Sequence, residues 1–229
     1  MRECLFLCTS NGTQAGEVGC AIIGHRFDGY RACLHLIGSP GEASIPGILR
    51  ILLESFADLR ALAADPTYVR RMLMQASQKR HRVVAGMLAA YKDNAEHKGT
   101  VERAERELAA IAKVIADLKD EGVSGGLTVA ERFKLGDLSL EQGFIYGDLS
   151  AHTHADFASI MARHLGKEKL QLGAPLSDQS FVKALVLPTF ILLDSLLLMS
   201  KLAMFDETKM TQLRERGVSL HHELRAMTV

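Results

Sequence analysis

The stretch Tyr146-Gly-Asp-Leu-Ser-Ala-His-Thr-His-Ala-Asp-Phe-Ala-Ser-Ile-Met161 combines helical periodicity with side chains capable of chemistry. On a helix that turns by about 100° per residue, partners at i, i+4 and i+7 share a face. One such face mixes polar and apolar residues, namely Tyr146, Ser150, His154, Phe157 and Met161. Another face is entirely polar and contains Asp148, His152, Asp156, Ser159 and Arg163. We therefore predict that His154 is buried and that His152 is exposed to water.

Helical patterns also occupy most of the chain on either side of this stretch. Apolar residues recur at intervals of three and four, and capping or proline signals separate the segments. We expect an all-α fold without a sheet, a single bundle of about seven to eight helices, in one domain over residues 1–229. Residues 1–13 are expected to be an N-terminal extension, and the helix within residues 206–229 to be peripheral. The predicted helices cover residues 14–37, 40–64, 66–94, 101–120, 128–135, 139 onward, 178–205 and 206–225.

The composition excludes a global electrostatic attraction to a partner. The chain has 27 basic and 27 acidic residues, so nucleic acid, an anionic membrane or an acidic substrate would need a local patch. Four cysteines, Cys4, Cys8, Cys20 and Cys33, have spacings unlike a paired zinc signature, and we interpret them as free thiols. The start of the chain lacks the basic and apolar regions of a secretion signal, which predicts a cytoplasmic protein.

The most apolar segment runs from Ala184 to Met199 and is nearly long enough to span a bilayer. However, Asp194 lies inside it and Pro188 interrupts it. Because a carboxylate is costly inside a membrane, we predict a buried central helix and no membrane partner.

The predicted helix over residues 40–64 has a wide apolar arc and one narrow polar stripe, formed by Arg50, Glu54 and Asp58 at intervals of four. From helical geometry alone we interpret this stripe as a solvated face with one weak ion pair. The alternative is that the stripe meets Ser150 and His154, because a buried serine and histidine each need a hydrogen-bond partner. Glu54 would then accept a hydrogen bond from His154, and Arg50 would balance the carboxylate.

One segment could form a basic surface. Residues 66–92 contain six lysines and arginines and no carboxylate, whereas residues 93–121 contain eight acidic and five basic residues. If the two segments pair as antiparallel helices, their charges neutralise each other, and we favour this interpretation. The alternative is an RNA-binding face, with Arg70, Arg71, Lys79, Arg80 and Arg82 as its candidate contacts.

Two short motifs resemble those of a bacterial family of helical proteins of unknown function. The first, Ile45-Pro-Gly-Ile-Leu-Arg50-Ile-Leu-Leu-Glu54-Ser-Phe-Ala-Asp-Leu, contains Arg-x-x-x-Glu, and the second is Tyr146-x-x-x-Ser150-x-x-x-His154. The resemblance spans residues 20–205 and is carried by these motifs. It implies a single all-helical domain in which Arg50 and Glu54 meet Ser150 and His154. No activity comes with it.

A more distant likeness is to the HEPN (higher eukaryotes and prokaryotes nucleotide-binding) superfamily, many of whose members are metal-independent ribonucleases of defence or toxin systems. Their signature is an arginine and, after four to six further residues, a histidine. Here it occurs only near the end, where Arg214 precedes His221 and Arg216 precedes both His221 and His222, and such spacings arise by chance. If the chain cleaves RNA, we expect instead that His154 is the general acid or base. Arg50 would stabilise phosphate charge, and Tyr146, Ser150 and Glu54 would complete the catalytic site.

Two other classes of function stay open. Asp148, His152 and Asp156 lie at intervals of four on one helix face, where neighbouring pairs could hold a cation. A solvated face explains the same pattern, and we expect no cofactor. A non-enzymatic interaction module needs no active residues, and it would be a homodimer through apolar arcs left on the long helices. A homodimer that binds a small ligand belongs to the same alternative. We expect the chain to be a homo-oligomer.

Overall fold

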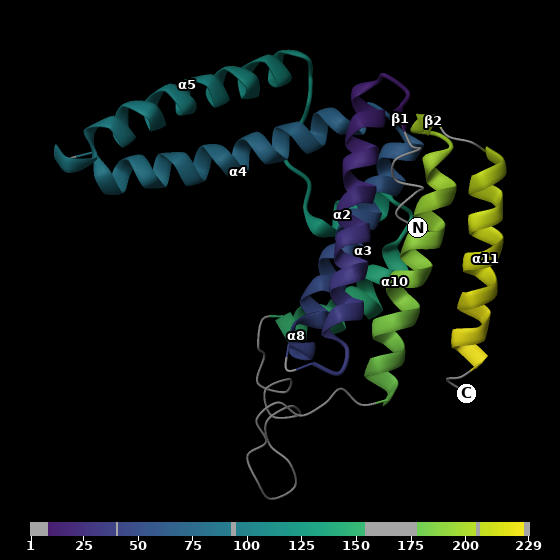
Figure 1. Ribbon diagram of the computed structural model, residues 1–229. Coiled ribbons are helices and arrows are strands. Elements are labelled where there is room, and N and C mark those ends of the chain that lie inside the picture. Colours follow the sequence, from purple (N-terminus) through teal and green to yellow (C-terminus); the bar gives the residue numbers. More distant parts are fainter. Residues whose placement is uncertain (1–8, 40, 93–94, 154–177, 205–206, 227–229) are drawn as a thin grey trace, which may run out of the picture. The chain divides into compact units, whose positions relative to one another are not determined.

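The computed structural model describes residues 9–39, 41–92, 95–153, 178–204 and 207–226 (Figure 1). Contacts within the chain divide it into two compact units. Unit 1 consists of Met1–Asp65 and Val129–Val229, and unit 2 consists of Pro66–Thr128. This division concerns compactness, and the expectation of one domain over residues 1–229 stays a prediction.

Unit 1 is built from helices. They are the α-helices α2 (Gln14–Leu36), α3 (Ile45–Ala64), α6 (Val129–Leu135), α7 (Ser139–Glu141), α8 (Gly147–Thr153), α10 (Asp178–Met199) and α11 (Glu207–Ala226), with the 3₁₀ turn η1 (Glu42–Ser44) and the π-helical η3 (Gln142–Tyr146). Strand pairing among the described residues is confined to β1 (Thr9–Ser10) and β2 (Ala203–Met204), which run antiparallel. The all-α prediction is confirmed, because this short ladder ties two helix ends together and adds no layer.

Helix α3 lies at the centre of unit 1 and contacts α2, α6, α8 and α10. Its predicted apolar arc is buried: Phe56, Leu59 and Leu62 are fully enclosed, and Leu53 is nearly so. Enclosing one such side chain contributes roughly 1.5–3 kcal/mol. The polar stripe of α3 is the part left to face α6 and η3.

Helices α2 and α10 follow the sequence prediction closely. The Thr13 side chain caps α2 by accepting a hydrogen bond from the Gly16 N–H at 3.0 Å. Helix α10 contains Pro188, as predicted, and buries Ile191 and Ser195. It ends at Met199, earlier than the predicted residue 205, because the chain next forms β2.

None of the described helices is apolar over a length sufficient to cross a membrane.

Unit 2 contains two long antiparallel helices, α4 (Tyr68–Tyr91) and α5 (Lys98–Asp120), joined through η2 (Ala95–His97) (Figure 1). The favoured interpretation, in which the basic segment and the acidic segment neutralise each other's charges, is confirmed for two pairs of side chains. Arg80 and Glu107 lie 2.5 Å apart, and Arg70 bonds to Glu121. The hydrogen bond between the first two raises the pKa of Arg80 and lowers that of Glu107.

The turn after α6 brings the backbone at Gly136 against α3. A Cβ at this position would lie 2.8 Å from the carbonyl oxygen of Ala57 and 3.1 Å from its Cα. Neither atom can swing aside, because both belong to the backbone of a buried helix. The Gly136 carbonyl also accepts a hydrogen bond from Arg60 Nε at 2.6 Å.

We expect Gly136→Ala to lower the free energy of unfolding by about 2 kcal/mol, the cost of forcing a methyl group into a packed contact. Urea denaturation measures it. The matched control is Gly24→Ala in α2, where nothing lies within 4 Å of an added Cβ. Equal stability of the two variants would contradict the close approach.

Candidate functional site

Three of the predicted site residues lie together in unit 1: Arg50 and Glu54 from α3, and Tyr146 from the end of η3. Arg50 Nε donates to Tyr146 OH and to Glu54 Oε1, both at 3.1 Å. Tyr146 OH donates to the same Glu54 oxygen at 3.0 Å. The guanidinium carbon of Arg50 lies 5.1 Å from the centroid of the Tyr146 ring. The three side chains therefore form a closed hydrogen-bonded triangle.

Arg132 of α6 extends this triangle along α3. Its Nη1 lies 3.3 Å from Glu54 Oε2, its Nε donates to Asp58 Oδ1 at 2.8 Å, and its Nη2 bonds to Asp58 Oδ2. The contact with Asp58 is thus bidentate, the geometry in which an arginine binds a carboxylate most strongly. We call Arg50, Glu54, Asp58, Arg132 and Tyr146 the α3 cluster.

The α3 cluster is partly buried, so the interpretation of the stripe as a solvated face is wrong. The exposed fractions of the side chains are 20% for Arg50, 23% for Glu54, 14% for Asp58 and 12% for Arg132. Burial lowers the pKa of Arg50, but its hydrogen bonds with Tyr146 and Glu54 outweigh this effect and raise the pKa above its ordinary value. Arg50 is therefore a permanent cation.

Ser150 lies one helical turn after Tyr146, in α8. Its Oγ is buried and has no hydrogen-bond partner within the part of the chain that is described. The predicted meeting of Ser150 with Arg50 and Glu54 is therefore not made through a hydrogen bond of this hydroxyl. His154 lies outside the described residues, and so does the side chain of His152. The predictions that His154 is buried and His152 exposed stay predictions.

The alternative metal face is described only at Asp148, which is exposed on α8. The His152 side chain and Asp156 fall outside the described residues. Among the described histidines, cysteines and carboxylates, no group of three has a geometry that could hold a metal ion.

A second polar group lies nearby on α3 and was not predicted. Arg60 Nη1 lies 3.2 Å from Asp194 Oδ2 of α10. The guanidinium carbon of Arg60 lies over the Phe56 ring, 5.7 Å from its centroid. The guanidinium carbon of Arg26, from α2, lies 5.1 Å from the centroid of the same ring, and Arg26 is only 1% exposed. It donates to Ser55 Oγ at 3.2 Å and bonds to Ser195 Oγ.

The burial of Arg26 had a signal in the sequence. Gly19, Ile23, Arg26 and Cys33 are separated by four, three and seven residues, so they share the inward face of α2. All four are buried. Burial lowers the pKa of Arg26 to about 9, although Asp58 and Asp194 partly offset this effect.

The arginine and histidine pairs with HEPN-like spacing belong to α11, which packs on α10. Arg214, Arg216 and His222 are exposed there, and His221 is half-buried. They are on a different helix from every residue of the α3 cluster.

Comparison with known proteins supports the family resemblance but assigns no activity to the chain. A family model described as a family of unknown function (DUF5677) matches residues 28–171. The matched range contains the whole α3 cluster, but it leaves out Arg26 and Asp194. No curated protein and no solved structure matches the chain. The predicted link to a family of unknown function is confirmed, whereas no match supports the HEPN-like resemblance.

Proposed function

The chain belongs to DUF5677, a family of unknown function, and we propose that it is a metal-independent ribonuclease. The family supplies no activity, so the proposal is argued from the α3 cluster. The observation that supports this best is the position of the Tyr146 hydroxyl. It is held 3.1 Å from a guanidinium nitrogen of Arg50 and 3.0 Å from a carboxylate oxygen of Glu54. A cation, a carboxylate and a phenol thus converge at a partly buried point.

These groups match the needs of RNA cleavage without a metal. The 2′-oxygen attacks phosphorus and forms a new bond, while the bond from phosphorus to the 5′-oxygen breaks. A base takes the 2′-hydroxyl proton and an acid gives a proton to the 5′-oxygen, leaving a cyclic phosphate and a free 5′-hydroxyl. In this proposal Glu54 takes the proton through Tyr146, and Arg50 stabilises the phosphorane. His154, outside the described residues, is the proposed acid.

The cluster also favours a reactive role on energetic grounds. Replacing a buried ion pair by apolar residues is often neutral or stabilising, so stability alone does not explain four charges in an aliphatic bundle. A reaction that needs a fixed cation beside a carboxylate does explain them.

The test uses purified chain, single-stranded and structured RNA, and a chelator to exclude metal ions. We expect cleavage by the natural chain, a loss of about a hundredfold in Arg50→Ala and a similar loss in Tyr146→Phe. The matched control is Arg31→Ala, which removes an exposed cation of α2 and leaves the rate unchanged. His154→Ala tests the proposed acid in the same assay.

Circular dichroism and urea midpoints show whether each variant folds. Tyr146→Phe keeps the ring that packs on Phe133 at 5.3 Å, so it separates chemistry from folding. No cleavage by the natural chain, or full activity of folded Arg50→Ala and Tyr146→Phe, would overturn the proposal.

A second candidate, the non-enzymatic interaction module, has its own supporting observation. The two arginines of the α3 cluster are balanced by two carboxylates, as in a network that only fixes how helices pack. Unit 2 also exposes apolar side chains: Val83 is 56% exposed, Leu73 39% and Val114 37%. Light scattering across protein concentrations tests for the homo-oligomer this candidate requires. A monomer at every concentration would count against it.

A further inference from the structure

A groove of about 650 Å³ lies between α4 and α5 within unit 2. Its apolar surface comes from α5, at Ala112, Ile115 and Ala116. Its polar surface comes from Gln78, His81 and Arg82 of α4 and from Lys119 of α5. The volume is in the range typical of ligand sites.

The sequence explains why the two helices leave a hollow here. In α5 the apolar seam recurs at three and four residues through Ala104, Leu108, Ile111, Ile115 and Leu118. The facing row of α4 is apolar at Met74 and Val84 but polar at Ser77 and His81 between them. Small alanines flank the α5 seam at the same level. Two helices with short or polar side chains at mid-length cannot fill the space between them.

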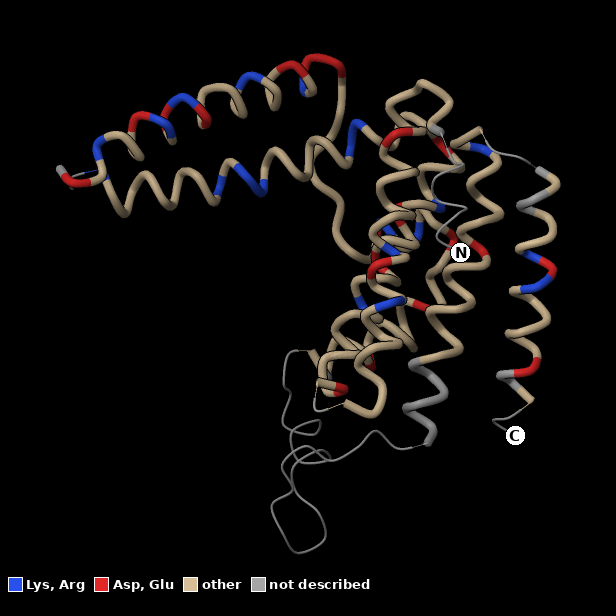
Figure 2. Tube along the Cα trace, in the orientation of Figure 1, with Lys and Arg blue, Asp and Glu red and all other residues tan. Residues whose placement is uncertain are grey.

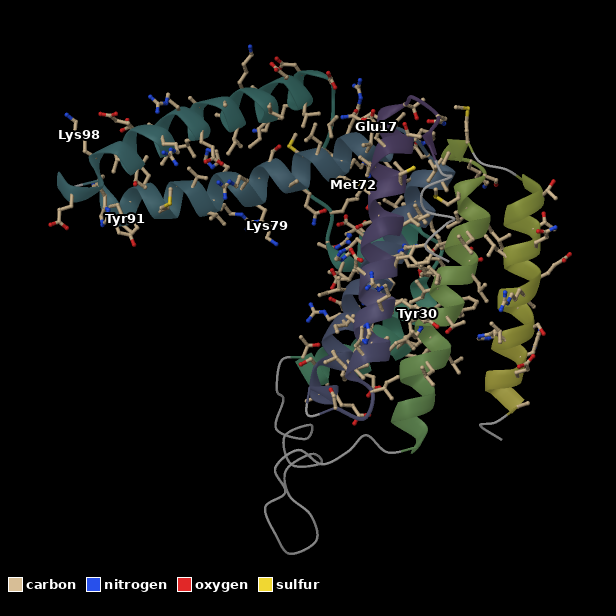
Figure 3. The ribbon with its side chains drawn as sticks, in the orientation of Figure 1. Glu17, Tyr30, Met72, Lys79, Tyr91 and Lys98 are labelled. Carbon is tan, nitrogen blue, oxygen red and sulfur yellow. The ribbon has the colours of Figure 1, made fainter. Side chains whose placement is uncertain are left out.

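The charge of the groove has one sign. None of its lining residues is a carboxylate, and Arg82 and Lys119 place cations on opposite walls. Figure 2 shows that α4 carries lysine and arginine without aspartate or glutamate, whereas α5 alternates both signs. Arg80 is already paired with Glu107 of α5, and Arg70 with Glu121, the residue that follows α5. Lys79 lies on the side of α4 that faces away from α5, outside the groove (Figure 3).

Donors continue beyond the groove along α4. Arg71, Gln78 and Arg82 lie at i, i+7 and i+11, so they form one stripe that is roughly 16 Å long. Gln75 lies between them, and its Nε2 already donates to the Leu127 carbonyl at 3.2 Å. Gln78 Oε1 accepts from the Gly126 N–H at 3.1 Å, which leaves the side-chain amide to act mainly as a donor. A row of donors this long suits a chain of phosphates better than one phosphate.

We propose that the α4–α5 groove binds single-stranded RNA, with Arg82 and Lys119 on successive phosphates and bases against the small alanines and His81. The inference rests on the proposed ribonuclease function and names where its substrate is held. An acidic peptide would meet the same cations, and competition by polyglutamate distinguishes it in the test below. A second copy of the chain would set like charges against each other across the groove.

The test measures binding apart from cleavage. A fluorescent oligonucleotide of about 12 nucleotides with 2′-O-methyl groups cannot be cut, and its anisotropy reports affinity for the full chain. We expect the double variant Arg82→Ala/Lys119→Ala to raise Kd at least tenfold. The slope of log K against the logarithm of the salt concentration should become shallower by about 1.4, or about 0.7 per lost phosphate contact.

The matched control is Arg103→Ala/Lys113→Ala, which removes the same charge from exposed positions of α5 outside the groove. Its Kd should change less than twofold. Equal losses of affinity in both double variants would overturn the groove proposal. So would displacement of the labelled oligonucleotide by polyglutamate as effective as that by unlabelled RNA, which would assign the groove to acidic peptides. Cleavage by natural chain together with unchanged binding by the groove variant would overturn this inference alone. Tight binding without any cleavage would overturn only the ribonuclease proposal.

Discussion

Replacing Arg132 by leucine should lower the free energy of unfolding by about 4 kcal/mol, within the range for breaking a buried ion pair by removing one partner. Arg132 binds both Glu54 and Asp58, and it is the most buried cation of the α3 cluster. Its loss leaves two partly buried carboxylates one helical turn apart, and Asp58 loses its bidentate arginine while Glu54 keeps Arg50 and Tyr146. Their mutual repulsion and lost hydrogen bonds both oppose folding.

Urea denaturation measures this effect as a shift in midpoint at constant slope. The matched control is Arg80→Leu, which breaks the exposed pair with Glu107 in unit 2 and should leave the midpoint unchanged. A double replacement, Arg132→Leu with Asp58→Leu, should recover part of the loss because one orphaned charge is removed. A midpoint for Arg132→Leu equal to that of Arg80→Leu would show that the α3 cluster does not stabilise unit 1.

The second large effect has the opposite sign. At pH 7, Arg26→Met should raise the free energy of unfolding by about 3 kcal/mol, because methionine fills a similar volume without burying a charge. The hydroxyl groups that Arg26 contacts keep other partners, since Ser55 Oγ donates to the Leu52 carbonyl at 2.9 Å and Ser195 Oγ bonds to Ile191 O. The variant therefore leaves neither hydroxyl unpaired.

The pH dependence of this difference follows from the pKa of Arg26, which burial lowers to about 9 from an ordinary value of 12.5. Above pH 9 the folded chain releases this proton while the unfolded chain keeps it. The unfolded state then binds more protons, so the stability of the natural chain rises with pH from this group. The advantage of Arg26→Met should therefore be full below pH 9 and shrink between pH 9 and pH 11.

Urea midpoints of both chains at pH 7, 9 and 10 measure the difference. Cys33, whose pKa burial raises to about 11, is present in both chains and cancels. Arg31→Met, at an exposed position of the same helix, is the matched control and should leave stability unchanged. A loss of stability in Arg26→Met, or a difference that grows with pH, would contradict the account of Arg26 as a buried cation.

Much of the candidate site follows from residue spacing, because helical residues three or four apart share a face whatever surrounds the helix. Arg50 and Glu54 are therefore neighbours in any structure where residues 45–64 are helical. The contact between Arg50 and Tyr146 needed one further condition, that two polar stripes in an aliphatic bundle face each other. That condition came from the cost of burying unpaired polar groups.

Asp58 and Arg132 show the limit of this reasoning. The stripe of Arg50, Glu54 and Asp58 can be exposed or covered with the same helical periodicity. Its environment depends on α6, a short helix that returns after the whole of unit 2. Nothing local to Arg132 points to a carboxylate 74 residues earlier in the chain.

The sequence by itself determined the helices, the apolar faces of α3 and α10, and the pairing of α4 with α5, because local periodicity and charge act between residues close along the chain. Tertiary structure alone decided that Arg132 binds the polar stripe of α3, that Phe56, Ser55 and Ser195 are the groups around the buried Arg26, and that a cationic groove remains between α4 and α5. These features depend on which helices approach each other and how closely. Packing between distant segments sets that approach, and no periodicity within one segment encodes it.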